Sequence, residues 1–257
     1  MDVVLLAGGQ LSPEDPLNAE CQDGYRSLVD IHGKPMVQWV IDALDACETI
    51  KDIHIIGLPG EHNLEASKPL HFLPGEENLF DNIRAGALHA ARIHPSQSKV
   101  IIASSDIPAI RTEAVDWLVD QVAEDLTALL YYCVIPQSVM EARYPESGRT
   151  FVRFRDVAVC GGDLNVIDQK LFSAETPVWR QLADARKHPL KQVRLLGFDS
   201  LILIALRVLT LEHAVKKVCK KLSLDARALL TPFAELGMDA DKLHQLAILR
   251  SDLEASL

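Results

Sequence analysis

The sequence has 257 residues and a formal net charge of −10, with 48% hydrophobic and 24% charged residues. These proportions are ordinary for a folded soluble protein, and the length suffices for a sizeable buried core. The negative charge, without a concentrated run of Lys and Arg, argues against a nucleic-acid-binding surface. An anionic nucleotide would still bind to a local set of backbone donors, a few basic side chains and a metal ion.

The five cysteines are an odd number and none belongs to a CxxC pair, so neither a zinc knuckle nor a disulfide framework is expected. No signal-type apolar stretch precedes the first predicted strand, and we expect a cytoplasmic protein. The apolar segment 193–211 is interrupted by Asp199 and Arg207. We interpret it as a buried or dimer-interface helix, and membrane contact is the less favoured alternative.

The first predicted element is a short buried strand, Val3–Leu6, which runs directly into Ala7-Gly8-Gly9. Adjacent glycines let backbone N–H groups approach a ligand closely, which suits phosphate oxygens. Taken alone, the tripeptide fits an ordinary tight turn equally well. No third glycine follows at the dinucleotide-binding spacing and no helix starts at once, so a nicotinamide dehydrogenase is disfavoured.

Strands and helices are predicted to alternate up to about residue 135. The predicted strands after the first cover 53–56, 100–103 and 126–135. A helix is predicted from Pro35 with Met36, Val37, Val40, Ile41 and Leu44 inward, and another over 78–91 with Leu79, Ile83, Ala87 and Leu88 inward. This alternation predicts a three-layer α/β fold with a mostly parallel mixed sheet, whose ligands bind at the carboxyl ends of the strands.

The second half is less regular. It predicts a half-exposed strand over 150–154, Gly161-Gly162 beside a strand at 164–167, and a last strand at 226–230. A helical pattern runs over 178–222. We therefore expect a single domain over residues 1–257 with a helical elaboration at about 178–222.

Three kinds of charged residue are candidates for chemistry. Arg26 and Lys34 are the basic residues nearest the glycine loop, and Lys34 stands at the mouth of a helix, where its charge does not stabilise the helix. Asp106 follows a buried strand and precedes Ile107-Pro108, at the predicted binding edge. Asp239 and Asp241 can supply a second carboxylate, as Mg²⁺ usually takes one or two. Each of these residues also fits an ordinary surface or turn position.

Three motifs together resemble the nucleotidyltransferase superfamily, and most closely its molybdenum-cofactor guanylyltransferase-like (MobA-like) NTP transferases. The motifs are Leu6-Ala7-Gly8-Gly9 with the segment 26–36, Ser105-Asp106-Ile107-Pro108, and Met238-Asp239-Ala240-Asp241. The segments 149–153 and 161–164 are similar to the same group. The resemblance implies a Rossmann-like, glycosyltransferase-A-like nucleotidyltransferase fold.

The activity implied by the resemblance is transfer of a nucleoside monophosphate from an NTP to a phosphorylated or hydroxyl small-molecule acceptor, with release of pyrophosphate. It implies nucleotide binding by Leu6, Ala7, Gly8, Gly9, Gln10, Asn78 and Asn82. It assigns the catalytic charges to Arg26, Lys34 and Asp106, and a Mg²⁺ ion to Asp106, Asp239 and Asp241. It places Arg153, Gly161, Gly162 and Asp163 on the acceptor side.

The glycine loop departs from the family pattern. It continues Gln10-Leu11-Ser12-Pro13 where the family usually has Gly-x-Gly-Thr/Ser-Arg, and Arg26 stands where a phosphate-binding lysine is usual. Arginine still pairs bidentately with phosphate. Two alternatives remain open. The missing loop arginine favours a non-catalytic nucleotide sensor. A nucleotide-sugar glycosyltransferase has a related fold, but Asp-x-Asp would be expected where Asp106 is followed by Ile107-Pro108.

Overall fold

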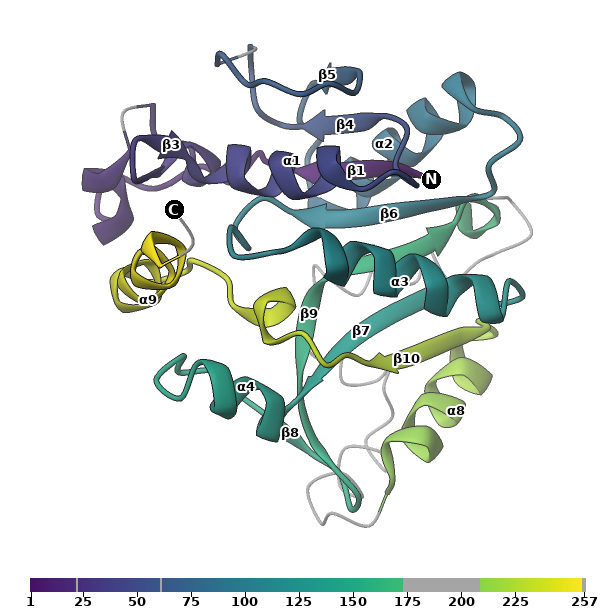
Figure 1. Ribbon diagram of the computed structural model, residues 1–257. Coiled ribbons are helices and arrows are strands. Elements are labelled where there is room, and N and C mark those ends of the chain that lie inside the picture. Colours follow the sequence, from purple (N-terminus) through teal and green to yellow (C-terminus); the bar gives the residue numbers. More distant parts are fainter. Residues whose placement is uncertain (22, 61, 173–208, 256–257) are drawn as a thin grey trace.

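The computed structural model describes residues 1–21, 23–60, 62–172 and 209–255, which form an eight-stranded sheet flanked by helices (Figure 1). Its strands are β1 (Asp2–Leu6), β4 (Ile53–Ile56), β5 (Leu70–Leu73), β6 (Lys99–Ser104), β7 (Leu130–Pro136), β8 (Val152–Arg153), β9 (Ala158–Asp168) and β10 (Ala226–Leu230). The order is β10-β7-β9-β6-β1-β4-β5, and β8 pairs with β9. Only pairings that involve β9 are antiparallel in this sheet, so the predicted mostly parallel mixed sheet is confirmed.

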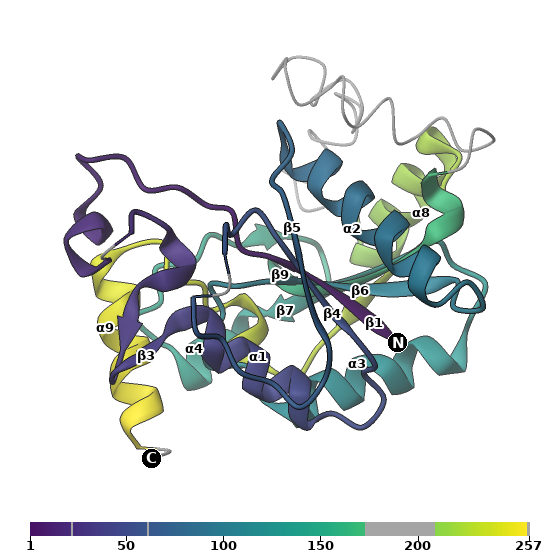
Figure 2. The ribbon, with the colours of Figure 1, turned by 90° about the horizontal axis from the view of Figure 1, so that it is seen from above.

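Helices cover both faces of the sheet (Figure 2). Helices α1 (Met36–Ala46) and α3 (Thr112–Glu124) pack on one face, and α2 (Leu79–Ile93) and α8 (Leu211–Leu222) on the other. Strand β1 supplies both cores because its side chains alternate: Val3 and Leu5 face α1, and Val4 faces α2. This is the three-layer α/β architecture expected from the sequence.

Smaller elements complete the fold. They are the hairpin β2 (Asp30–Ile31) and β3 (Lys34–Pro35), the helices α4 (Gln137–Arg143) and α9 (Leu243–Glu254), and the 3₁₀ turns η1 (Pro16–Glu20), η2 (Arg26–Leu28), η3 (Gln169–Phe172) and η4 (Ala234–Gly237). Helix α9 lies beside the β2–β3 hairpin, where His32 Nε2 is 2.7 Å from the Arg250 carbonyl oxygen.

The inner face of α2 differs from the prediction. Leu79 and Leu88, expected to point inward, are 45% and 36% exposed. The helix instead presents small residues to the sheet, because a Cβ at Gly86 would lie 2.5 Å from Ile56 Cδ1 and 2.6 Å from Val4 Cγ1. Ala87 is fully buried and Ile83 packs against the same core, as predicted. Only Leu79 and Leu88 were placed wrongly, because close approach selects glycine and alanine on this face. In α1, by contrast, the predicted inner face is fully buried throughout.

Several predictions in the second half need correction. Strand β7 starts at Leu130 rather than at 126, and the expected strand 150–154 shrinks to the two residues of β8. Gly161 and Gly162 lie inside β9, not beside a strand. The strand at 226–230 is confirmed as β10, parallel to β7. Of the predicted helical elaboration, α8 covers 211–222, and residues 178–208 lie outside the described residues, as does most of the apolar segment 193–211.

Among the helices that the structure describes, we find none that combines the length and the apolar character needed to cross a bilayer.

The packing of α2 can be tested with a matched pair of substitutions. Gly86→Val should lower the free energy of unfolding by about 1–3 kcal/mol, because the new side chain overlaps Val4 and Ile56. Arg84→Val introduces the same residue on the exposed side of the same helix and should cost less than about 1 kcal/mol. Urea unfolding measures both. Equal losses would show that the glycine is not required by close packing.

Candidate active site

Glycines from three parallel strands meet at the carboxyl edge of the sheet. Gly8 follows β1, Gly57 follows β4, and Gly75 comes two residues after β5. A Cβ at Gly57 would lie 2.6 Å from Gly8 Cα, and a Cβ at Gly75 would lie 3.2 Å from Gly57 Cα. Gly57 also has φ +87°, which disfavours other residues. Gly57 and Gly75 were missed as site residues, although each stands just past a strand.

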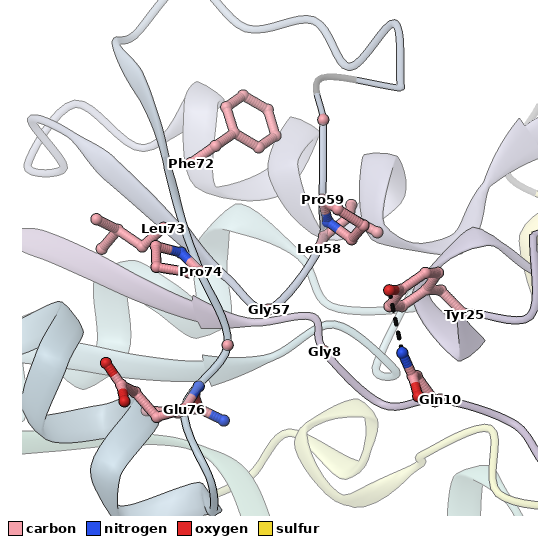
Figure 3. A pocket seen from close by; sticks show the side chains of 13 residues that line it. Gly8, Gln10, Tyr25, Gly57, Leu58, Pro59, Phe72, Leu73, Pro74 and Glu76 are labelled. Carbon is pink, nitrogen blue, oxygen red and sulfur yellow. Dashed lines mark hydrogen bonds between the residues drawn. The ribbon is translucent and has the colours of Figure 1, made fainter.

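A cleft of about 640 Å³ opens over these glycines (Figure 3). Its walls come from the loops after β1, β4 and β5, and Figure 3 shows the Tyr25 and Gln10 side chains meeting at one side. There Gln10 Nε2 donates a hydrogen bond of 3.1 Å to the Tyr25 hydroxyl. The lining residues are Gly8, Gln10, Tyr25, Gly57, Leu58, Pro59, Gly60, Phe72, Leu73, Pro74, Gly75, Glu76 and Asn82.

A second cavity of about 320 Å³ adjoins the first, since Gly8 and Asn82 line both. It extends past Gly9 and Arg26 to Asp106. The loop between the cavities is held in place, because Ser27 Oγ donates to the Ala7 carbonyl at 2.9 Å and Arg26 N donates to the Gly9 carbonyl at 2.8 Å. Within the described part of the chain the backbone N–H groups of Gly8 and Gly9 donate no hydrogen bond. They are available to an anion.

The two predicted asparagines have different places. Asn82 lines both cavities, and its Oδ1 accepts a hydrogen bond from Glu76 N at 2.7 Å, which fixes the loop after β5. Asn78 caps α2, since its Oδ1 accepts from the backbone of Phe80 and Asp81. Asn78 lines neither cavity, so its role in nucleotide binding stays a prediction.

Lys34 is not brought into the cleft. Its Nζ lies 2.6 Å from Asp42 Oδ2 and 4.1 Å from the centre of the Trp39 ring. It lines neither cavity, and its catalytic role stays a prediction without a contact to support it.

The three predicted metal ligands lie near enough to interact electrostatically, but among the described residues their oxygens do not form a group within 4.8 Å. Ala240 N donates to the Asp106 carbonyl at 2.9 Å, which tethers the loop carrying Asp239 and Asp241 to the end of β6. Arg26 bonds Asp241, and its Nη1 lies 3.8 Å from Asp106 Oδ2. Burial, and then the carboxylates of Asp239 and Asp241, raise the pKa of Asp106.

A bulge in β9 brings in a fourth carboxylate. Tyr132 and Val134 of β7 pair with Asn165 and Gly161, so two steps in β7 face four steps in β9. The Asn165 side chain fills the gap: its Oδ1 accepts from Cys133 N at 2.9 Å, and its Nδ2 donates to the Gly162 carbonyl at 3.0 Å. Asp163 lies at this bulge.

The environment of Asp163 is dominated by burial and negative charge. Burial, followed by the carboxylates of Asp106 and Asp239, raises the pKa of Asp163 to about 7. Its Oδ2 is buried and has no hydrogen-bond partner among the described residues. The predicted acceptor-side residue Asp163 therefore belongs to the same carboxylate cluster as Asp106, Asp239 and Asp241.

On the acceptor side, the arginine that contacts this cluster is Arg149, not the predicted Arg153. Arg149 bonds Asp239 and donates to the Gly161 carbonyl at 3.3 Å. Arg153 lies exposed on the short strand β8. Both arginines lie in the segment 149–153, which is similar to the family. Arg149 precedes β8, whereas Arg153 lies on it. A Cβ at Gly161 would overlap the Tyr132 hydroxyl, so the exposed tyrosine side chain would have to move to admit it.

The donor set of the cluster fits a hard divalent cation. All candidate ligands are carboxylate oxygens, which suit Mg²⁺, Ca²⁺ or Mn²⁺ better than softer metals. The Oδ2 atom of Asp163 is buried and has no hydrogen-bond partner among the described residues. A bound cation or a proton would satisfy this oxygen.

Comparisons with known proteins identify the family of the chain. The family model for the MobA-like NTP transferase domain matches residues 3–222. The chain belongs to this family. It is also similar to the solved structure of a hypothetical transferase from Thermus thermophilus, with 32% identity and a TM-score of 0.81 over 95% of this chain and 98% of that one.

Two curated relatives carry different substrates in their names. A probable molybdenum cofactor guanylyltransferase of Pyrococcus horikoshii is 26% identical over 94 residues, which is 37% of this chain and 46% of that protein. A 2-C-methyl-D-erythritol 4-phosphate cytidylyltransferase of Bifidobacterium longum is 28% identical over 139 residues, 50% of this chain and 45% of that protein. The chain thus spans less than half the length of either relative, and the base and acceptor do not follow from them.

The protonation of Asp163 has a measurable effect on stability in the metal-free protein. The pKa of an unfolded aspartate is about 3.9, whereas burial and neighbouring carboxylates raise the pKa of Asp163 in the folded chain to about 7. Between these pH values the folded chain keeps a proton that the unfolded chain has lost, so this residue's contribution to stability falls as pH rises. Asp163→Asn removes the effect and should become more stable relative to wild type from about pH 4 to about pH 8.

Urea unfolding with a chelator present, at several pH values, measures the difference. The exposed Asp120→Asn serves as the control and should show no comparable trend. A stability difference between Asp163→Asn and wild type that stays constant with pH would contradict the assignment.

Proposed function

We propose that the chain is a Mg²⁺-dependent nucleotidyltransferase that transfers a nucleoside monophosphate from an NTP to a small phosphorylated or hydroxyl acceptor and releases pyrophosphate. One observation carries the proposal: the glycine-lined cleft and the carboxylate cluster are continuous, since Gly8 and Asn82 line both cavities and Asp106 ends the second. A base in the larger cleft directs the phosphates over Gly8 and Gly9 toward Asp106.

The residues present suit this reaction because phosphoryl-type transfer depends on positioning and charge neutralisation more than on a protein nucleophile. Free backbone N–H groups of Gly8 and Gly9 hold phosphate oxygens. Arg26, which lines the second cavity, pairs with them through its planar guanidinium. Asp106, Asp239 and Asp241 hold Mg²⁺, which when bound neutralises phosphate charge.

The acceptor is assigned to the side of the cluster formed by β9. Arg149 stands there beside Gly161 and supplies a cation for an acceptor phosphate. Asp163 and the backbone of Gly161 and Gly162 border the same space. This assignment replaces Arg153 by Arg149 and keeps the other acceptor-side residues as predicted.

Nucleotide binding can be tested by thermal unfolding with CTP, GTP, ATP and UTP in the presence of Mg²⁺. A triphosphate at a hundred times its dissociation constant should stabilise the chain by about 2.7 kcal/mol. Gly57→Ala should abolish this shift, since its Cβ enters the contact with Gly8. Gly33→Ala is the matched control: Gly33 also has a positive φ, +79°, but nothing lies within 4 Å of its added Cβ. If no triphosphate raises the melting temperature of the wild type, the proposal fails.

Catalysis can be tested by pyrophosphate release with a panel of phosphorylated and hydroxyl acceptors. Asp106→Asn should lower the rate by about 100-fold or more, because a charge that offsets the transferring phosphate is lost. Asp120→Asn, an exposed aspartate on α3, should keep the wild-type rate. An unchanged rate in Asp106→Asn would remove this residue from the mechanism. A wild type that binds triphosphate but releases no pyrophosphate with any acceptor would be a sensor instead.

A further inference from the structure

A cluster of three histidines lies between the sheet and α2, away from the carboxylate cluster. His54 and His71 are register partners on β4 and β5, and their rings stack with centroids 4.8 Å apart. His89 projects from α2, and its Nδ1 lies 3.1 Å from His54 Nδ1. One ring nitrogen from each histidine lies within 4.8 Å of the others.

The spacing of these nitrogens suits coordination to one metal ion. Imidazole nitrogens bind Zn²⁺ at about 2.0–2.1 Å in tetrahedral geometry, which sets them about 3.3 Å apart. The 3.1 Å between His54 Nδ1 and His89 Nδ1 is close to that separation. A ring nitrogen of His71 lies within 4.8 Å of a nitrogen of each of these two histidines.

His54 is incompletely satisfied by the protein alone. Its side chain is 0% exposed, and its Nε2 has no hydrogen-bond partner in the described part of the chain. That atom lies 3.7 Å from Asp2 Oδ2, too far for a hydrogen bond. Coordination through Nδ1 would place the ring proton on Nε2, facing this carboxylate.

Two carboxylates face ring nitrogens of these histidines, an arrangement that is common around metal-binding histidines. Asp52 Oδ2 lies 2.7 Å from His71 Nε2, which leaves Nδ1 of His71 as the free ring nitrogen. Asp2 faces His54 and is itself held by His94 Nδ1 at 2.9 Å. Ligating histidines commonly donate their second ring N–H to a carboxylate, which fixes the tautomer and raises the basicity of the ligand.

The cluster is distinct from the nucleotide cleft in position and in chemistry. His54 precedes Gly57 by three residues of extended chain, about 10 Å, and imidazole nitrogens suit Zn²⁺, Cu²⁺ or Ni²⁺ rather than Mg²⁺. An ion can enter from solvent, because the His71 side chain is 26% exposed.

We propose that His54, His71 and His89 bind one divalent transition-metal ion of the Zn²⁺ class, with Asp2 and Asp52 orienting the imidazoles. The ion joins β4, β5 and α2, the same elements that position Gly57, Gly75 and Asn82. It acts as a structural tie behind the nucleotide cleft. The proposal does not depend on the activity of the chain.

The experiment uses the full chain after treatment with a chelator and a return to buffer with excess Mg²⁺, which occupies oxygen ligands. Calorimetric titration with Zn²⁺ should give one ion per chain, and Co²⁺ should give the visible absorption of a nitrogen-ligated site. His89→Asn should weaken Zn²⁺ binding by about 100-fold or more and abolish the Co²⁺ absorption. Asp52→Asn should weaken it by about 10- to 100-fold.

Two controls separate this site from others. His213→Asn changes an exposed histidine on α8 and should bind Zn²⁺ as the wild type does. Asp106→Asn should leave the Co²⁺ absorption unchanged, because that aspartate belongs to the carboxylate cluster. The proposal is overturned if the wild type binds no Zn²⁺ in excess Mg²⁺, or if folded His89→Asn binds it with wild-type affinity. The cluster would then be a hydrogen-bonded imidazole network only.

Discussion

Four carboxylates share one space beyond the carboxyl end of β6, and their mutual repulsion is the constraint that this part of the chain must offset. Each of Asp106 and Asp163 has its pKa raised by burial and by its acidic neighbours. Among the described residues, the cationic side chains paired with this cluster are those of Arg26 and Arg149. Two arginines against four aspartates leave an excess of negative charge, which a divalent cation would offset.

The same pairing links the two halves of the proposed reaction. Arg26 now bonds Asp241 beside the nucleotide cavity, and Arg149 bonds Asp239 beside the acceptor side. A cation held by the aspartates would weaken both pairs and free both guanidinium groups for phosphate oxygens. Under the proposed function, metal binding and substrate binding therefore favour one another.

Sequence patterns predicted what depends on local periodicity and failed where close packing or strand irregularity decides. The buried face of α1 and the edge shared by Gly8 and Asp106 follow from hydrophobic spacing and from the rule that ligands bind at strand ends. The exposure of Leu79 and Leu88 on α2 does not, because the contact of Gly86 with Val4 is a property of the assembled layers. The bulge of β9 cannot be predicted from the alternation of apolar and polar residues, because that alternation assumes a regular strand. No sequence pattern marks Asn165 as the residue that fills the bulge. The position of Gly161 was therefore not predictable, and neither was its contact with Arg149 rather than Arg153.

The small-residue face of α2 has a consequence for both sites. Because Gly86, Ala87 and Ala90 let the helix approach the sheet, Asn82 reaches the Glu76 backbone at one end and His89 reaches His54 further along. Larger residues would lift the helix from β1 and β4 and separate both pairs at once. The part of the glycine-lined cleft that β4, β5 and α2 form, and the imidazole cluster behind it, therefore depend on the same close helix–sheet contact. A tie between His54, His71 and His89 would act on the helix and the two strands whose loops form that cleft.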